Sequence, residues 1–159
     1  MTLRLIKCAL AAFLGLLGFI YGLENIANLD AAYNVISTVL SMAGHEYYPN
    51  SIGPAISSPI LVWITVALII TGEISGGAIA LKGAYDLFMS RHKDTFNEAK
   101  KTLYIGAGVL LIVWFGFFTV IGGAFFQMWQ TELGSMSLEG AFQFVGSVTL
   151  VTLFIALPD

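Results

Sequence analysis

Long runs of apolar residues divide this chain into four segments, with shorter polar stretches between them. The longest run lies between Pro59 and Lys82 and contains a single charged residue, Glu73. Because a helix rises about 1.5 Å per residue, a run of about 22 residues reaches roughly 33 Å, enough to cross a bilayer core. Soluble helices are not apolar on every face over such a length. The pattern therefore predicts a membrane-spanning helix over residues 59–82 with a carboxylate inside it.

Three further runs predict three further spans. Residues 5–27 begin among basic residues, as a signal peptide does. Their apolar run is longer than that of a signal peptide, and no small-residue cleavage site follows it. We therefore expect an uncleaved first span. Residues 103–126 carry no charge, and neither do residues 141–157, although these are few for a crossing. The chain is therefore predicted to be an all-α membrane protein, a single domain over residues 1–159 with four transmembrane helices.

The connecting stretches differ in character. Residues 30–43 repeat apolar side chains at helical spacing, and about 14 residues are too few to cross a membrane. They predict a short amphipathic helix in the first outer loop, on the membrane surface or on the bundle. Residues 49–59 contain three prolines and are expected to form a loop. Residues 82–102 mix charges of both signs, which is typical of a solvated linker, with helical structure returning near its end.

The distribution of basic residues predicts the orientation. All seven lysines and arginines lie in the N-terminal segment or between the second and third spans, and the other two connections have none. Since cytoplasmic segments of membrane proteins are rich in Lys and Arg, four crossings place both termini in the cytoplasm, and we expect a bacterial inner membrane. The residues that mark the outer interface are then Glu24, Asn28, Asp30 and Trp129.

Composition excludes several classes of function. Charged residues make up 11% of the chain, against about 25% in soluble domains, and a net charge of −3 does not suit nucleic-acid binding, which needs a basic surface. The single cysteine, Cys8, allows no internal disulfide. The two histidines, His45 and His92, fall in connections on opposite sides and cannot hold a haem between helices. Motifs of phosphate loops, nucleophile elbows and metalloproteases are absent, so we expect no catalytic residues and no metal site.

Four stretches of the chain resemble a family of bacterial proteins described as predicted small integral membrane proteins, domain of unknown function 2165. The stretches are ENIANLDAAYNVISTVLSM, ISSPILVWITVALIITGEISGGAIALKGAYDLF, FGFFTVIGGAFFQMWQ and AFQFVGSVTLVTLFIALPD. The resemblance implies a protein of four membrane helices, in agreement with the apolar runs. It implies no reaction, because the activity of the family is unknown.

Glu73 is the first candidate for a functional residue. A charge at the centre of a membrane helix costs at least about 2.5–3.5 kcal/mol on insertion scales, so we expect Glu73 to be protonated, hydrogen-bonded or beside water. Its distance from Lys82 predicts a position in the cytoplasmic half of the membrane. Side chains that could donate a hydrogen bond to it are Thr119, Gln143 and Ser147. Glu73 either fastens helices together or carries protons or cations, and we favour the fastener.

Glycines at helical spacing predict close contacts between helices, because small residues let two backbones approach. They occur as a pair in the first span, as a group around Glu73, and as a pair in the third span. The residues are Gly18, Gly22, Gly72, Gly76, Gly77, Gly122 and Gly123. These faces can pack within the bundle or against a partner.

The leading functional hypothesis is a non-enzymatic accessory or structural subunit that packs against a larger inner-membrane complex. A respiratory complex is one such complex. It depends on the glycine faces and on the absence of a catalytic set. One alternative is a homo-oligomeric transporter or channel component that uses Glu73. The other is a protein that binds a quinone or lipid between the second and third spans, and such a molecule is the only bound ligand that we expect. The expected partners are the lipid bilayer and other membrane subunits, with no nucleic acid.

Overall fold

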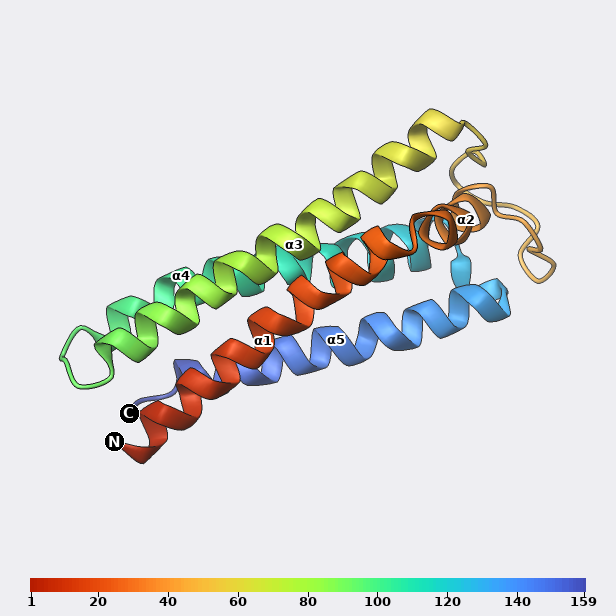
Figure 1. Ribbon diagram of the computed structural model, residues 1–159. Helices are drawn as coiled ribbons and strands as arrows, with labels where there is room; N and C mark the ends of the chain where they lie inside the picture. The colour runs from red at the N-terminus through yellow and green to blue at the C-terminus, as the bar shows by residue number, and fades with distance from the viewer.

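Four long helices lie side by side in an elongated bundle in a computed structural model that describes residues 1–159 (Figure 1). All of the regular structure is helical, and no strand is present. The elements in chain order are α1 (Thr2–Ala27), α2 (Leu29–Leu40), α3 (Pro59–Ser90), α4 (Phe96–Leu111), the π-helix η1 (Ile112–Phe125), the 3-10 helix η2 (Met128–Gln130) and α5 (Glu132–Ala156). Helix α4 runs directly into η1, and the two together form one long rod.

Four rods are long and apolar enough to cross a membrane, which confirms the prediction of an all-helical chain with four candidate spans. They are α1, α3, the rod of α4 with η1, and α5. With four rods, both termini lie at one end of the bundle together with the loop between α3 and α4 (Figure 1). Helix α2 and the long connection that follows it lie at the opposite end.

The prediction of a solvated linker over residues 82–102 is wrong for residues 82–90, which are helical, whereas the helical structure expected near the end of the segment is present. Helix α3 continues to Ser90 and α4 already begins at Phe96, so only a short loop remains. Lys82 and Asp86 form an ion pair one helical turn apart, which supports the helix where a linker was expected. The Phe96 side chain is fully buried in the main apolar core. Of the charged residues here, Lys82, Asp86, Glu98 and Lys101 lie on helix surfaces, Lys100 is buried, and Arg91, Lys93 and Asp94 are in the loop.

The stretch before the fourth predicted span is also helical instead of a loop. Thr131 caps α5, because its hydroxyl oxygen accepts a hydrogen bond from the Gly134 backbone N–H at 3.1 Å. Glu132 stands in the first turn, where its charge is favourable to the helix dipole. Helix α5 therefore begins well before Ala141, the expected start of the span, and is long enough to cross a membrane.

The second half of the third rod is π-helical, a feature that its uniformly apolar sequence does not signal. The Phe126 backbone N–H donates to the Ile121 oxygen at 2.9 Å, which is a five-residue step. Turns of this width usually occur singly inside α-helices, frequently at functional sites. The segment ends where Gln127 adopts a left-handed conformation, with φ 51°, and the chain turns toward η2 and α5.

Helices α1 and α3 touch backbone to backbone. A Cβ atom added at Gly77 would lie 2.3 Å from the Phe19 backbone nitrogen, and one added at Gly15 would lie 2.7 Å from the Leu81 nitrogen. Real Cβ atoms do not approach other atoms so closely, so only glycine fits at these positions. The same close packing recurs between α3 and α4, where a Cβ at Gly106 would lie 2.4 Å from the Ala80 nitrogen.

A short helix, α2, is present in the first connecting stretch. Asn28 alone separates it from α1, and it crosses the end of the bundle that lies away from the termini (Figure 1). Its Val39 and Leu40 are buried in a small apolar cluster with Val62 and Val66 of α3. The cluster fixes α2 against the bundle.

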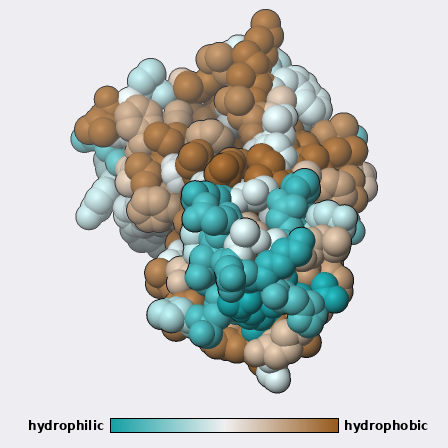
Figure 2. Space-filling view, turned by 90° about the vertical axis from the view of Figure 1, so that its left-hand side faces the viewer, coloured by the Kyte–Doolittle hydropathy of each residue, from teal (hydrophilic) through white to brown (hydrophobic).

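Two lysines are buried at the end that carries the termini. The Lys7 side chain has no exposed surface, and its Nζ donates to Asp159 Oδ1 at 2.6 Å. Lys100 Nζ lies 3.5 Å from Asp159 Oδ2, so a single carboxylate pairs with both. Burial alone would raise the pKa of Asp159, but the hydrogen bond from Lys7 and the charge of Lys100 outweigh it and lower that pKa. Figure 2 shows this end as a hydrophilic patch bordered by apolar side chains.

Candidate functional site

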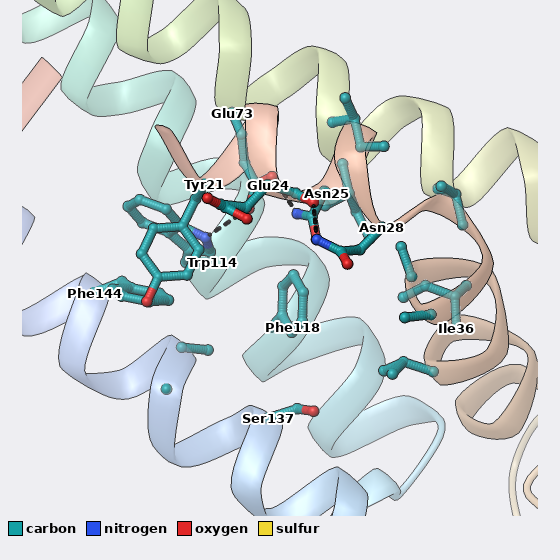
Figure 3. Close-up of a pocket in the computed structure, with 18 residues that line it drawn as sticks. Tyr21, Glu24, Asn25, Asn28, Ile36, Glu73, Trp114, Phe118, Ser137 and Phe144 are labelled. Atoms are coloured by element: carbon teal, nitrogen blue, oxygen red, sulfur yellow. Dashed lines mark hydrogen bonds between the residues drawn. The ribbon is translucent and has the colours of Figure 1, made fainter. Parts of the chain in front are cut away.

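A cavity of about 440 Å³ lies among α1, α2, α3, η1 and α5, in the half of the bundle away from the termini (Figure 3). Most of the residues that line it are apolar, which is typical of sites for small molecules. Its lining also includes polar and aromatic residues that come from several helices. These are Tyr21, Glu24, Asn25, Asn28, Glu73, Trp114, Phe118, Ser137 and Phe144.

Glu73 is the buried acid of this cavity, with 2% of its surface exposed. One carboxylate oxygen accepts a hydrogen bond from the Asn25 side-chain amide at 2.7 Å. The other accepts from the Trp114 indole N–H at 3.2 Å. A carboxylate has about four acceptor positions on its two oxygens, so about two remain free beside the cavity.

The hydrogen-bond donors predicted for Glu73 are wrong. Thr119 donates its hydroxyl hydrogen to the Trp114 backbone oxygen at 3.2 Å, within its own helix. Gln143 and Ser147 are both exposed on the surface of α5. The actual donors come from the last turns of α1 and from the start of η1. Apolar periodicity does not reveal which polar side chains from other helices meet at one depth.

The argument behind the predicted depth of Glu73 does not hold. That prediction assumed that the membrane helix ends at Lys82, but α3 continues to Ser90. Asn25, which bonds to Glu73, lies about 27 Å along α1 from Lys7 at the terminal end of the bundle. Glu73 therefore lies close to the middle of α3, slightly toward the end away from the termini, beside the last turn of α1.

The polar lining from α1 lies on one helical face. Tyr21, Asn25 and Asn28 follow one another at steps of four and three residues, which places their side chains along the same face. The Asn28 side-chain amide donates to the Glu24 backbone oxygen at 2.8 Å, at the point where α1 ends. Their spacing in the sequence is a signal for a polar face on α1, although it does not show that this face meets Glu73. The sequence places Glu24, Asn25 and Asn28 together at the exit from the first span, but it does not predict that Asn25 bonds to Glu73.

Three aromatic rings form a continuous cluster in the cavity wall. The Tyr21 and Phe144 ring centroids are 4.5 Å apart, and those of Trp114 and Phe144 are 4.6 Å apart. Tyr21 also meets Trp114 edge-on, with 6.4 Å between centroids. Figure 3 shows the three rings next to Glu73, so the carboxylate and the aromatic surface face the same space.

A second, apolar cavity of about 280 Å³ adjoins the first, between α2, α3 and η1. Residues common to both linings are Val35, Ile36, Ile69 and Phe118. The second lining is almost entirely hydrophobic. Together the two cavities provide a compartment with polar and aromatic groups next to one that is almost entirely apolar.

The seven predicted packing glycines all face neighbours within the chain. A Cβ at Gly18 or Gly76 would approach the Leu110 side chain, and one at Gly72 would approach Val113. The remaining four lie against other parts of the same bundle. They are Gly22 against Ile74, Gly77 against Phe19, Gly122 against Met128 and Gly123 against Leu138.

The other predicted interface residues lie apart from the cavity. Asp30 is exposed in the first turn of α2. Trp129 is half exposed and packs edge-on against Tyr48, with 5.2 Å between ring centroids. His45 and His92 do not join other ligand side chains, since no three His, Cys, Asp or Glu side chains converge anywhere in the chain.

The core between Glu73 and the lysines at the terminal end is apolar. Leu14, Leu103 and Leu110 are buried there, and the polar residues that are buried as a whole are confined to the two ends and to Glu73 itself. The Thr152 hydroxyl on α5 is buried along this stretch without a hydrogen-bond partner, but no continuous chain of buried polar side chains connects Glu73 with the lysines. The arrangement therefore gives no support to a pathway through the bundle.

Four membrane-length helices around a single buried carboxylate define the class of this molecule as a small helical membrane protein. The family described as predicted small integral membrane protein (DUF2165) matches residues 3–158. The chain belongs to this family and is an integral membrane protein. Neither a curated protein nor a solved structure matches it.

Proposed function

We propose that this protein binds a small amphipathic molecule, of the size of a quinone headgroup or a short lipid, in the central cavity. The observation that carries the proposal is the pair of adjoining cavities, about 440 and 280 Å³, one with a polar corner and one without. Ligand sites typically have about 300–1,000 Å³ of space, an apolar lining and a few fixed polar groups. The polar part of the ligand would contact Glu73 and Asn25, and its apolar part would extend toward α2.

Native mass spectrometry after gentle detergent extraction tests the proposal. A Cβ at Gly140, which lines the cavity, would meet no atom within 4 Å, so Gly140→Phe is a suitable variant to fill the space. We expect the natural chain to retain a small hydrophobic molecule and Gly140→Phe to lose it. Gly146→Phe is the matched control, because Gly146 is on the same helix, has the same open space, and lies outside the cavity lining. Equal retention by both variants would place the molecule elsewhere.

A second candidate function is a structural subunit of a larger membrane complex. One observation favours it. In the most apolar stretch of α5 only 17% of residues are buried, against 33% in each of the other three spans. Phe142 and Leu150 are among the large side chains that this helix leaves exposed. The glycine faces no longer support the hypothesis, because they pack inside the chain.

Affinity purification of the tagged protein tests the second candidate. We expect a fixed proportion of partner subunits, lost when Phe142 and Leu150 are both changed to Ala. Ile105→Ala on α4, also at an exposed position, is the control and should retain the partners. Recovery of this chain alone, as a monomer or homo-oligomer, would contradict the subunit hypothesis.

For the setting of the site we propose a bacterial inner membrane with both termini in the cytoplasm. The seven basic residues support this orientation, because they lie on the terminal side of the four spans. In this orientation the cavity lies in the outer half of the membrane. Helix α2 is then an amphipathic helix at the outer surface, with exposed Tyr47 and Tyr48 in the connection that follows it.

A further inference from the structure

We infer that the ligand of the central cavity is a lipophilic organic cation, held between the Glu73 carboxylate and the rings of Trp114 and Phe144. The inference rests on the proposed function, since it names the chemical class of the ligand for the same cavity. It follows from three features of the lining: its charge, its aromatic rings and its apolar extension.

The charge of the cavity is one-sided. Glu24 and Glu73 both line it, and no lysine, arginine or histidine does. The donors to Glu73 are the neutral side chains of Asn25 and Trp114, so the chain supplies the carboxylate with hydrogen bonds and no counter-charge. A buried carboxylate is stable as an ion when a cation pairs with it. A bound cation would complete this site, whereas an anionic ligand would meet two acids.

The aromatic rings suit a cation of low hydration. Tyr21, Trp114 and Phe144 form a continuous surface with 4.5 and 4.6 Å between successive ring centroids. The faces of such rings attract ammonium groups, and the attraction is stronger where water is excluded. Quaternary ammonium groups are commonly recognised in this way, between several rings and a carboxylate.

The lining favours an organic cation over a metal ion. Calcium takes about six to eight oxygen ligands, and magnesium takes six in a strict octahedron. The chain brings no three acidic, histidine or cysteine side chains together, and most of this lining is hydrocarbon. The adjoining apolar cavity, reached past Ile69 and Phe118, accommodates an alkyl or aryl tail. The cation is therefore amphipathic.

A pair of probes that differ only in charge tests the inference. Dodecyltrimethylammonium carries a positive nitrogen, and 2,2-dimethyltetradecane has a neutral carbon in the same position. Binding is followed by Trp114 fluorescence of the full chain in maltoside micelles. Trp63 and Trp129, which are 44% and 40% exposed, are both changed to Phe so that Trp114 alone reports. We expect saturable binding of the cation, at least tenfold tighter than that of the hydrocarbon.

Glu73→Gln tests the role of the charge, because Gln keeps the size of the side chain and can still accept hydrogen bonds. We expect Glu73→Gln to weaken cation binding at least tenfold and to leave hydrocarbon binding unchanged. Glu139→Gln removes an exposed acid of α5 outside the cavity lining and is the matched control, which should bind both probes normally. If Glu73→Gln fails to fold, Phe144→Leu is the second variant, and it should weaken cation binding about threefold or more.

The outcomes separate this inference from the proposed function. Equal binding of both probes, unaffected by Glu73→Gln and Phe144→Leu, would overturn the cation while leaving a cavity that binds apolar molecules. No binding of either probe, together with no natural ligand lost in Gly140→Phe, would overturn the proposed function itself. Cation binding that persists in Gly140→Phe would place the cation outside the cavity and contradict the inference.

Discussion

Glu73 is the one buried acidic side chain in the interior of the bundle. Its two oxygens accept hydrogen bonds from α1 and η1, so one carboxylate connects three helices. Each donor would be left unsatisfied in a buried position if the carboxylate were lost. The cost of an unsatisfied buried group is generally larger than the net gain from the bond that it makes.

The first prediction follows from these two bonds. Glu73→Leu should lower the free energy of unfolding by about 1–2 kcal/mol, because the Asn25 and Trp114 donors lose their acceptor while intramembrane hydrogen bonds remain modest in strength. Glu73→Gln retains an acceptor and should stay within about 0.5 kcal/mol of the natural chain. Denaturant unfolding in mixed micelles measures both. Equal losses for the two variants would show that the bonds do not stabilise the bundle.

At the residue scale, the sequence reveals a candidate but not its surroundings. Glu73 is identifiable because a charge within a long apolar run is rare and expensive. Asn25 is not identifiable, since it stands among other polar residues at the end of a span and its depth depends on where α3 actually ends. Trp114 looks like any apolar core residue in a charge-free segment until the fold brings its N–H to Glu73.

At the element scale, α1 and α3 are in close backbone contact. Both backbones come so near at Gly77 and Gly15 that no side chain fits between them. Close approach brings many backbone and side-chain atoms into van der Waals contact, which replaces the hydrophobic driving force that lipid does not provide.

The second prediction concerns this contact. Gly77→Ala should destabilise the bundle by about 1–3 kcal/mol, because the new methyl group would lie 2.3 Å from a backbone nitrogen of α1 that cannot move aside. Gly108→Ala is the matched control on α4, where a Cβ meets nothing within 4 Å. It should be neutral or stabilising by about 0.5–1 kcal/mol, the usual gain of Ala over Gly within a helix. Thermal unfolding of the two variants in the same detergent compares them, and a larger loss for Gly108→Ala would contradict the packing argument.

The number of spans could be predicted from the sequence, whereas the helix ends could not. Apolar length decides whether a helix crosses, and four runs have that length. The ends depend on local devices that hydropathy ignores, such as the Thr131 cap and the ion pair of Lys82 with Asp86. The π-helical turns of η1 have no compositional signature either, because the segment is as uniformly apolar as an ordinary membrane helix.

At the scale of the whole molecule, polar groups divide between two ends. The terminal end holds the buried lysines and the hydrophilic patch of Figure 2, and the other end holds the cavity and α2. This division fits a molecule that meets water on both sides of a membrane and lipid along its length.

The third prediction tests the orientation. With Cys8 replaced by Ala, Ile52→Cys should react with an impermeant thiol reagent added outside intact cells, because Ile52 is 88% exposed in the connection after α2. His92→Cys, in the exposed loop between α3 and α4, should react only after the cells are opened. Outside labelling at His92→Cys would reverse the proposed orientation.

The fourth prediction concerns the buried charges at the terminal end. Asp159→Asn should lower the free energy of unfolding at pH 7 by about 3 kcal/mol, because it leaves the buried Lys7 without a counter-charge. Asp86→Asn removes the carboxylate of the exposed pair with Lys82 and should cost less than about 1 kcal/mol.

The pH dependence of this contribution has a definite sign. The pKa of Asp159 is lowered in the folded protein, so its stabilisation is complete above the unfolded value of about 3.9 and is lost as the pH falls through the lower folded value. Unfolding measured from pH 7 down to pH 3 should show a smaller acid-induced loss for Asp159→Asn than for the natural chain. An equal loss in both would mean that Asp159 does not titrate with folding.

The contact between Lys7 and Asp159 also bears on how the protein is made. During translation, Lys7 enters the membrane with α1 long before the ribosome reaches Asp159, and the two residues are separated by 152 positions. The close α1–α3 contact can form early in synthesis, but the ammonium group of Lys7 has no carboxylate to pair with until α5 has been inserted. Nascent chains that stop within α5 therefore have three complete spans, part of the fourth, and a lysine without a counter-charge. They should be far more prone to degradation than their small loss of length implies.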